Sequence, residues 1–83
     1  GAAEAIEAVA HGDALNSKVV GRHADDLELP PNSTIGAIVR GDEVLILEKD
    51  VVIQPDDHLV LFLADKKAIG AVERLFQVDV GFI

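Results

Sequence analysis

The sequence contains no cysteine, methionine, tryptophan or tyrosine, and three phenylalanines are its only large aromatic residues. Without cysteine there is no disulfide framework, no thiolate metal ligand and no cysteine nucleophile, which is compatible with a reducing compartment. No apolar run approaches the roughly 20 residues that a membrane-spanning helix needs. The first residues also lack the charged region and apolar core of a signal peptide. These absences argue against a disulfide-stapled secreted protein and against a membrane-spanning one.

Positive charge is scarce, because 15 acidic residues face only 7 basic ones and the formal net charge is -8. Such a charge repels phosphate backbones and anionic lipids, so we expect no binding to nucleic acid and no direct binding to lipid. Solubility alone would account for the acidic surface. At 83 residues the chain is expected to form one domain with a marginal core of its own, and association with a second copy would extend the buried surface.

The most structured stretch of the sequence is Thr34–Ala64. Ile35–Val39 and Val44–Leu47 are short apolar runs rich in β-branched residues, which favours two strands. Gly41-Asp42 separates them, and glycine accepts the positive φ that a tight hairpin turn requires. The spacing predicts a β-hairpin that continues into a third strand, as a β-meander.

A second turn is predicted at Gln54–Asp57, where Pro55 pre-sets the φ angle of the first central position. Asp56 at the next position suits a type I turn. The run that follows, Leu59–Leu63, is apolar at every position, so both of its faces need to be covered. The cover comes from the chain's own helices or from a second copy.

The first segment, Ala2–Ala10, gives conflicting signals. Its residues are strong helix formers, and Ile6, Val9 and Ala10 lie at helical spacing, so local propensity favours a helix. A loose alternation of apolar and polar residues also permits a strand. Farther on, a charged stretch at residues 22–27 could form about two helical turns before two consecutive prolines end it.

A helix is predicted over Lys66–Gln77, with Asp65 as its N-cap. Gly70 in its interior costs about 1 kcal/mol relative to alanine, which suggests that another backbone approaches closely there. The tail Val78–Ile83 alternates apolar and polar residues, so we expect it to be ordered and docked rather than frayed. The helix and the strands supply more apolar surface than one small fold covers, and the residues that we predict to form a dimer or docking surface are Leu61, Ile69, Val72, Phe76 and Phe82.

No pattern in the sequence indicates catalysis or metal binding. The three histidines lack the spacing of a zinc site, and a cluster of acidic residues lacks the alternating pattern and bidentate glutamate of an EF-hand loop. There is no nucleophile elbow, phosphate-binding loop or dinucleotide fingerprint. An Arg-Gly-Asp tripeptide is explained by the predicted hairpin turn. The residues considered are His11, His23 and His58; Asp25, Asp26 and Glu28; and Arg40, Gly41 and Asp42.

Four motifs in sequence order carry a resemblance that covers nearly the whole chain. They are V-V-G-R-x-x-x-D-L-x-L-P, T-I-G-A-I-V-R-G-x-E-V-L-I, V-I-Q-P-D-D-H-L-V-L-F-L and D-K-K-x-I-x-x-V-E-R-L-F-Q. In this order and spacing the chain resembles the C-terminal regulatory domain of RCK proteins, the TrkA-C domain. Many members of the family carry Pro-Gly-Asp where this chain has Pro55-Asp56-Asp57, so Asp56 replaces a glycine, either in a type I turn or in a tolerated left-handed conformation.

The resemblance implies a dimerising α+β domain, with a small mixed or antiparallel sheet, β-hairpins and a C-terminal helix. It also implies that the chain begins with a strand, and we follow it for Ala2–Ala10. Residues 1–83 would be a single TrkA-C domain. This domain would be a fragment of a longer protein, and the fragment would not include the Rossmann RCK-N domain of that protein. NAD or ATP would bind only that absent domain, so no cofactor is expected here.

The function implied by the resemblance is regulatory and not enzymatic. The domain would help a cytoplasmic ring to control potassium transport through a Trk-type membrane transporter, at the inner face of the cell membrane. The alternative is a sensor domain that binds a small ligand, a nucleotide or an ion, at the dimer interface.

Overall fold

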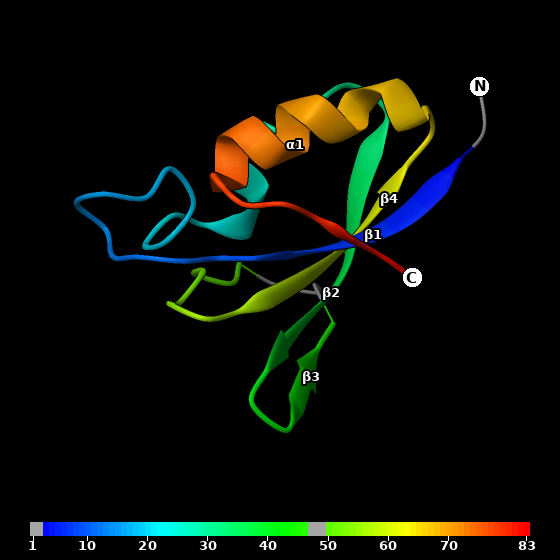
Figure 1. Ribbon diagram of the computed structural model, residues 1–83. Helices are drawn as coiled ribbons and strands as arrows, with labels where there is room; N and C mark the ends of the chain where they lie inside the picture. Colours follow the sequence, from blue (N-terminus) through cyan, green and yellow to red (C-terminus); the bar gives the residue numbers. More distant parts are fainter. Residues whose placement is uncertain (1–2, 47–49) are drawn as a thin grey trace.

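One helix lies against one face of a five-stranded antiparallel sheet in the computed structural model, which describes residues 3–46 and 50–83 (Figure 1). The strand order is β3-β2-β4-β1-β5. This is an α+β fold, as predicted. The elements are β1 Glu4–Val9, η1 Ala24–Asp26, β2 Ser33–Arg40, β3 Glu43–Leu45, β4 His58–Leu63, η2 Lys66–Ala68, α1 Ile69–Phe76 and β5 Gly81–Phe82, where η denotes a 3-10 helix.

The N-terminal segment is a strand, despite its strong helix propensity. β1 is hydrogen-bonded to β4 on one side and to β5 on the other. Its residues Ile6 and Ala8 are fully buried, as is Ala10 just beyond its end. Burial of alternate side chains between two neighbouring strands outweighs the intrinsic preference of alanine and glutamate for helix. The expectation of a strand is confirmed.

The predicted hairpin is present as β2 and β3. Arg40 pairs with Glu43 across a two-residue turn, and Gly41 has φ +60, the positive value that the first central residue of a type II′ turn requires. β3 is only three residues long. Leu47, which we placed in this strand, lies outside the described residues.

The prediction of a β-meander is wrong, because β4 pairs with β2 and β1 instead of β3. β3 is mostly exposed and offers little apolar surface to a further strand. The chain after it crosses to the loop that follows β1, where the Ile53 N–H donates to the Arg22 carbonyl oxygen at 2.9 Å and the Gly21 N–H donates to the Ile53 carbonyl oxygen at 2.8 Å. Burial of the Ile53 side chain stabilises the position of this connecting segment. The segment therefore leads into β4 at the centre of the sheet.

The turn before β4 is type II and not the predicted type I. The Asp57 N–H donates to the Gln54 carbonyl oxygen at 3.2 Å, so a β-turn is formed. Pro55 occupies the first central position, and Asp56 has φ +67 at the second, which is the left-handed conformation that a type II turn requires there. Aspartate adopts this conformation more readily than most residues but at a cost that glycine does not have.

Replacing Asp56 by glycine is therefore expected to leave the free energy of unfolding unchanged or to raise it by up to about 1 kcal/mol, because relief of left-handed strain offsets the greater freedom of glycine in the unfolded chain. Urea denaturation of the 83-residue chain measures the difference. The control is Asp79→Gly, at an exposed residue without positive φ. This variant should have a free energy of unfolding about 0.5–1 kcal/mol lower than that of the wild type. A loss at position 56 as large as that at position 79 would contradict the type II assignment.

The helical segments are shorter than the sequence predicts. The expected N-cap is confirmed, because a carboxylate oxygen of Asp65 accepts the Lys67 N–H at 2.9 Å, but the first turn is the 3-10 helix η2 before α1 begins. Gln77 ends α1 in a left-handed conformation, with its N–H donating to the Glu73 carbonyl oxygen at 2.7 Å. The charged stretch at residues 22–27 forms only the short η1, after which Leu27 is buried.

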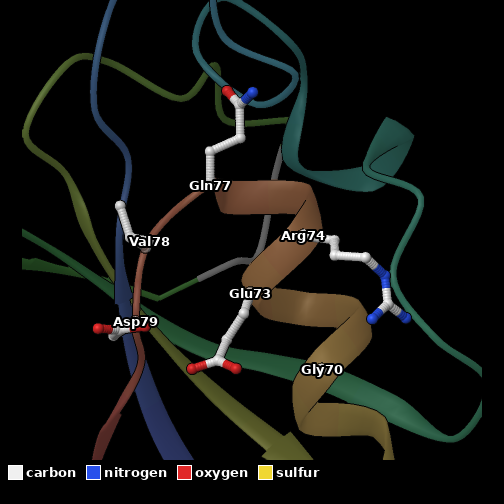
Figure 2. A pocket seen from close by; sticks show the side chains of 6 residues that line it. All are labelled: Gly70, Glu73, Arg74, Gln77, Val78 and Asp79. Atoms are coloured by element: carbon white, nitrogen blue, oxygen red, sulfur yellow. The ribbon is translucent and has the colours of Figure 1, made fainter.

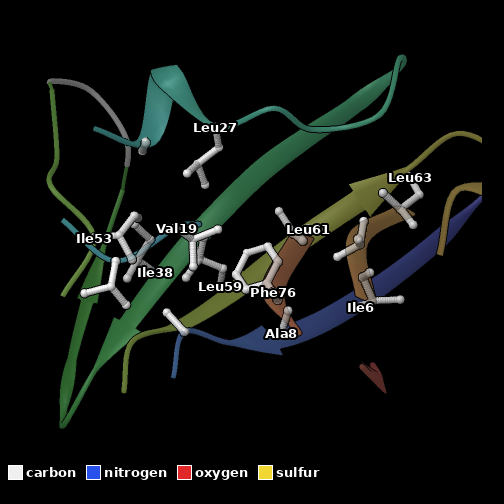
Figure 3. Close-up of a cluster of buried hydrophobic side chains, with 14 residues drawn as sticks. Ile6, Ala8, Val19, Leu27, Ile38, Ile53, Leu59, Leu61, Leu63 and Phe76 are labelled. Atoms are coloured by element: carbon white, nitrogen blue, oxygen red, sulfur yellow. The ribbon is translucent and has the colours of Figure 1, made fainter. Parts of the chain in front are cut away.

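The hydrophobic core lies between the sheet, α1 and the long loop that joins β1 to β2 (Figure 3). Strands, loop and helix each contribute buried side chains, including Ile6, Val19, Ile38, Ile53, Leu59, Leu61, Leu63, Val72 and Phe76. The tail is docked on its own sheet, as β5 beside β1, and the Ile83 N–H donates to the Ala5 carbonyl oxygen at 3.0 Å. The expectation of an ordered tail is confirmed.

Candidate functional site

The five residues predicted to form a docking surface do not share one surface. Leu61, Val72 and Phe76 lie in the core of the single chain, with at most 2% of their surface exposed. Ile69 is partly buried against that core, and only Phe82, at 65%, is largely exposed. Helical spacing identified the apolar stripe of α1 correctly, but the chain's own sheet covers it. Of the five predicted residues, only Ile69 and Phe82 keep exposed surface with which to dock a partner.

The opposite side of the sheet carries apolar side chains that no helix within residues 3–46 and 50–83 covers. Residues paired directly across neighbouring strands share a face of the sheet. The pairs Ile6–Leu61 and Ala8–Leu59 point into the core, so the intervening residues Ala5, Glu7, Val60 and Phe62 point the other way. On β2 and β3 the same alternation places Thr34, Ala37, Val39 and Val44 on this second side. We call this side of strands β1 to β4 the open face.

Phe62 is the largest side chain of the open face and is 51% exposed. It lies over Gly36, and a Cβ atom at position 36 would overlap its ring. Strand β2 has a register shift between Ile35 and Ala37, which places Gly36 as an extra residue against β4. The bulge and the missing side chain leave room for the ring to pack against the strand.

The polar residues of the open face are few and largely paired. His58 Nδ1 lies 3.0 Å from a carboxylate oxygen of Glu7, on the neighbouring strand. Glu7 is the only acidic residue that alternation places on this face within strands β1 to β4, and Thr34 is the only hydroxyl. Val44, at the β3 edge, is 60% exposed. The open face therefore presents apolar atoms to water across four strands.

A buried ion pair fixes the turn that leads into β4. The carboxylate of Asp57 is fully buried and accepts bonds from Arg40 Nε and Nη2, both at 2.9 Å, and from the Gln54 N–H at 2.8 Å. Arg40 Nη2 also donates to the Val52 carbonyl oxygen at 3.0 Å. Burial alone would raise the pKa of Asp57, but the hydrogen bonds from Arg40 and Gln54 outweigh it, so its pKa lies below its ordinary value. The bond to Asp57 raises the pKa of Arg40.

This ion pair is structural in character. Its bidentate geometry joins the end of β2 to the β4 turn and to the crossing segment around Val52. Sequence reasoning assigned Arg40 to the hairpin turn and Asp57 to the turn before β4, and it did not pair the two residues. The signal that could have found the pair is the position of Asp57 directly before an apolar central strand, where a carboxylate needs a partner.

An open groove of about 480 Å³ runs beside the end of α1 (Figure 2). Glu73 and Arg74 point to opposite sides of the helix, and a carboxylate oxygen of Glu73 accepts the Val80 N–H at 3.2 Å. The close approach of a backbone that we predicted at Gly70 is not found, because the nearest group to an added Cβ atom would be the Arg74 guanidinium at 3.3 Å. Glu73 thus holds the tail against the helix.

The remaining polar candidates do not assemble into a reactive site. His23 Nδ1 lies 2.7 Å from Asp50, and both side chains are about half exposed. Within residues 3–46 and 50–83, no group of three or more histidine, aspartate or glutamate side chains could hold a metal ion. The same residues include no helix that is both long and apolar enough to cross a membrane.

Comparison with known proteins identifies the family. The model of the TrkA-C domain matches residues 14–77. The chain is 61% identical over 82 residues to the Trk system potassium uptake protein TrkA of Halomonas elongata and 61% identical over 83 residues to that of Vibrio alginolyticus. The identity to the protein of the same name from Haemophilus influenzae is 47% over 83 residues.

These alignments cover 99% or more of the chain but only 18% of each relative, so the chain spans about a fifth of the length of the proteins it matches. The matched region includes both residues of the buried ion pair and strands β2 to β4 of the open face. The motifs, the α+β fold and the family match agree, and the chain belongs to the TrkA-C domain family.

Proposed function

We propose that this chain is the regulatory and oligomerisation domain of a cytoplasmic subunit that controls potassium uptake through a Trk-type membrane transporter. The observation that carries the proposal is the identity of 61% to two proteins named Trk system potassium uptake protein TrkA, over 99% or more of the chain. The domain acts by association and shape and not as an enzyme.

In this proposal the chain is one domain of a longer subunit, which fits its coverage of 18% of its relatives. A nucleotide-binding RCK-N domain would occupy another part of that subunit, and any effect of NAD or ATP would act there. Two copies of the present domain pair, the pairs join a ring, and the ring contacts the transporter at the inner face of the membrane. The net charge of -8 supports a protein partner over a lipid one.

A rigid domain suits such a role, because a regulator shifts a transporter between states only through contacts that differ between them. The Arg40–Asp57 pair holds the turn before β4 to the end of β2, and strand β5 holds the C-terminal tail to β1. A change in the attached parts of the subunit would then be passed on as a movement of the whole domain.

The proposal is tested by potassium uptake in cells whose transport depends on the full-length parent. Deletion of the segment corresponding to residues 1–83 is expected to lower the initial uptake rate severalfold at equal transporter abundance, because the ring loses its pairing domain. A parent carrying Asp56→Gly serves as the matched control and should transport at the normal rate. Normal uptake by the deletion variant would refute the proposed function.

A further inference from the structure

The exposed side of α1 contains a glycine for which the described part of the chain shows no need. Gly70 lies within the helix, where glycine is less favourable than alanine because its backbone loses more freedom on folding. It has no positive φ, and the nearest group that an added Cβ atom would meet is the flexible end of the Arg74 side chain, at 3.3 Å. An alanine would therefore fit within the chain. A helical glycine also lets another backbone approach closely, and no described residue does so at Gly70.

A second unfavourable feature lies on the same side of the helix. Lys66 and Lys67 occupy the first turn of the helical segment that η2 and α1 form together, where the helix dipole disfavours cations. Lys66, Gly70 and Arg74 are spaced four residues apart, so they share one side of the helix. We refer to Lys66, Lys67, Gly70 and Arg74 as the outer helix face. Two local costs on one face, without a gain inside the chain, are typical of a binding surface.

The outer helix face is hollowed beside its glycine. The groove of about 480 Å³ at the end of α1 has Gly70, Arg74, Val78 and Asp79 among its lining residues (Figure 2). The Arg74 guanidinium lies in the space beside Gly70, and a partner can displace so flexible a group and pack against the helix backbone. Glu73 points to the other side of the helix, where its carboxylate accepts the Val80 N–H, so it does not neutralise Arg74.

The charges of the outer helix face indicate the chemistry of its partner. The two lysines and Arg74 belong to exposed residues, and none of the ion pairs among the described residues includes them. The net charge of the chain is -8, but charges more than about 8 Å away are largely screened at physiological ionic strength. Asp42 and Glu43, for example, belong to the β2–β3 hairpin, which lies at the far end of the molecule from α1 (Figure 1). The face therefore suits a segment that carries carboxylates.

The same charges indicate where that segment comes from. Cytoplasmic loops of membrane proteins carry an excess of lysine and arginine, so a loop of the transporter would be repelled. A second copy of the domain, related by a two-fold axis, would oppose the same cations to each other. The chain spans only 18% of the length of its relatives, which leaves about four-fifths of such a subunit outside the present domain. An acidic helix in that remaining part is the occupant that fits.

We propose that the outer helix face docks an acidic helix from another part of the same subunit. Gly70 is the point of closest backbone approach, and Lys66, Lys67 and Arg74 pair with carboxylates of the partner helix. The inference rests on the proposed function, which places this chain in a longer subunit, and it adds the surface that couples the domain to the rest of that subunit. A movement elsewhere in the subunit would reach the domain through this contact.

The test is carbodiimide cross-linking of the purified full-length parent, without transporter or lipid, followed by mass spectrometry of the cross-linked peptides. The reagent couples a lysine amine to a carboxylate in contact with it, so the peptide that is joined to the lysine identifies the partner segment. We expect Lys66 and Lys67 to be joined to aspartate or glutamate outside the present domain. The yield should be severalfold higher than for Lys18, an exposed lysine of the β1–β2 loop.

Gly70→Ala separates docking from folding. In the 83-residue chain this variant should melt at a higher temperature than the wild type, because alanine favours the helix. In the parent it should lower the cross-linking yield of Lys66 and Lys67 at least threefold, because the added methyl group holds the partner helix away. Gly81→Ala is the matched control, since an added Cβ atom there meets nothing within 4 Å, and it should cross-link like the wild type.

Three results would overturn the proposal. The first is that Lys66 and Lys67 are joined only to carboxylates of the present domain, or are joined to others only after transporter or anionic vesicles are added. The second is an unchanged cross-linking yield in Gly70→Ala. The third is a lower melting temperature of Gly70→Ala in the 83-residue chain, because the glycine would then serve the domain's own fold.

These results are independent of the uptake experiment. Loss of uptake on deletion of the domain, without cross-links to the rest of the subunit, would leave the proposed function standing and remove the outer helix face as a docking surface. Normal uptake on deletion, together with the expected cross-links and their loss in Gly70→Ala, would refute the function and leave the docking surface established.

Discussion

Replacing Arg40 by methionine is expected to destabilise the folded chain by about 3–5 kcal/mol, the usual cost of leaving a buried charge without its partner. The substitution retains most of the apolar stem of the side chain but removes both guanidinium bonds to the fully buried Asp57 carboxylate. Small domains are stable by only about 5–15 kcal/mol, so a large share of the native stability would be lost. Urea denaturation followed by circular dichroism measures this loss in the free energy of unfolding.

Arg22→Met is the matched control, because Arg22 is exposed and the same change should cost less than about 0.5 kcal/mol. A double variant, Arg40→Met with Asp57→Asn, should recover part of the loss, since a neutral amide is cheaper to bury than an unpaired carboxylate. Equal stability of Arg40→Met and Arg22→Met would show that the ion pair does not hold the turn.

The pH dependence follows from the direction of the pKa shift. The pKa of Asp57 is lowered in the folded chain, so its contribution to stability is present above its unfolded value of about 3.9 and is lost as pH falls through the lower folded value. In Arg40→Met, burial without the guanidinium raises the pKa of Asp57, and protonation then relieves the buried charge. The difference in stability between the wild type and the variant should therefore narrow as pH falls. The narrowing begins above about pH 4, where Asp57 of the variant takes up its proton, and continues below it, where the wild type loses its own contribution. A difference that does not change with pH would contradict this account.

Replacing Phe76 by alanine is expected to lower the free energy of unfolding by about 3–5 kcal/mol, because the residue is only 2% exposed and removal of its ring leaves a cavity. In urea denaturation, the variant should unfold at a lower midpoint concentration, while the dependence of the free energy of unfolding on urea concentration stays unchanged. Phe82→Ala is the matched control, and it should cost less than about 1 kcal/mol because most of that ring is already in water. Unchanged stability of Phe76→Ala combined with weaker association would restore the helix stripe as the docking surface.

The features that the sequence predicts well are those governed by neighbouring residues. The hairpin at Gly41 and the N-cap at Asp65 depend on contacts within a few positions, and both are present. The tail is ordered beside β1, as predicted, but Phe82 is 65% exposed. The strand at the start is different, because its local propensity favours helix and only the resemblance to the TrkA-C family identified it. Pairing on both sides of β1 explains why tertiary context prevails.

The features that the sequence misses depend on contacts between distant segments. Pairing of β4 with β2 instead of β3 is enforced by the crossing segment at Ile53, whose partners lie some 30 residues earlier. The left-handed Asp56 could not be distinguished from a type I residue, because aspartate occupies both conformations. The apolar run Leu59–Leu63 did indicate that both faces of β4 need cover, but only the structure identifies which face the chain itself covers.

The most direct measurement of whether the chain's own sheet covers the apolar side of α1 uses the fact that the chain has only three phenylalanines, one in the core, one on the open face and one in β5. Fluorophenylalanine incorporated at Phe62, Phe76 and Phe82 gives three ¹⁹F resonances, which can be assigned by single substitution and followed as a soluble paramagnetic agent is added. We expect the agent to broaden the Phe62 and Phe82 resonances and to leave that of Phe76 sharp, because only Phe76 is buried. Broadening of the Phe76 resonance to the same extent as the other two would contradict coverage of the helix by the sheet.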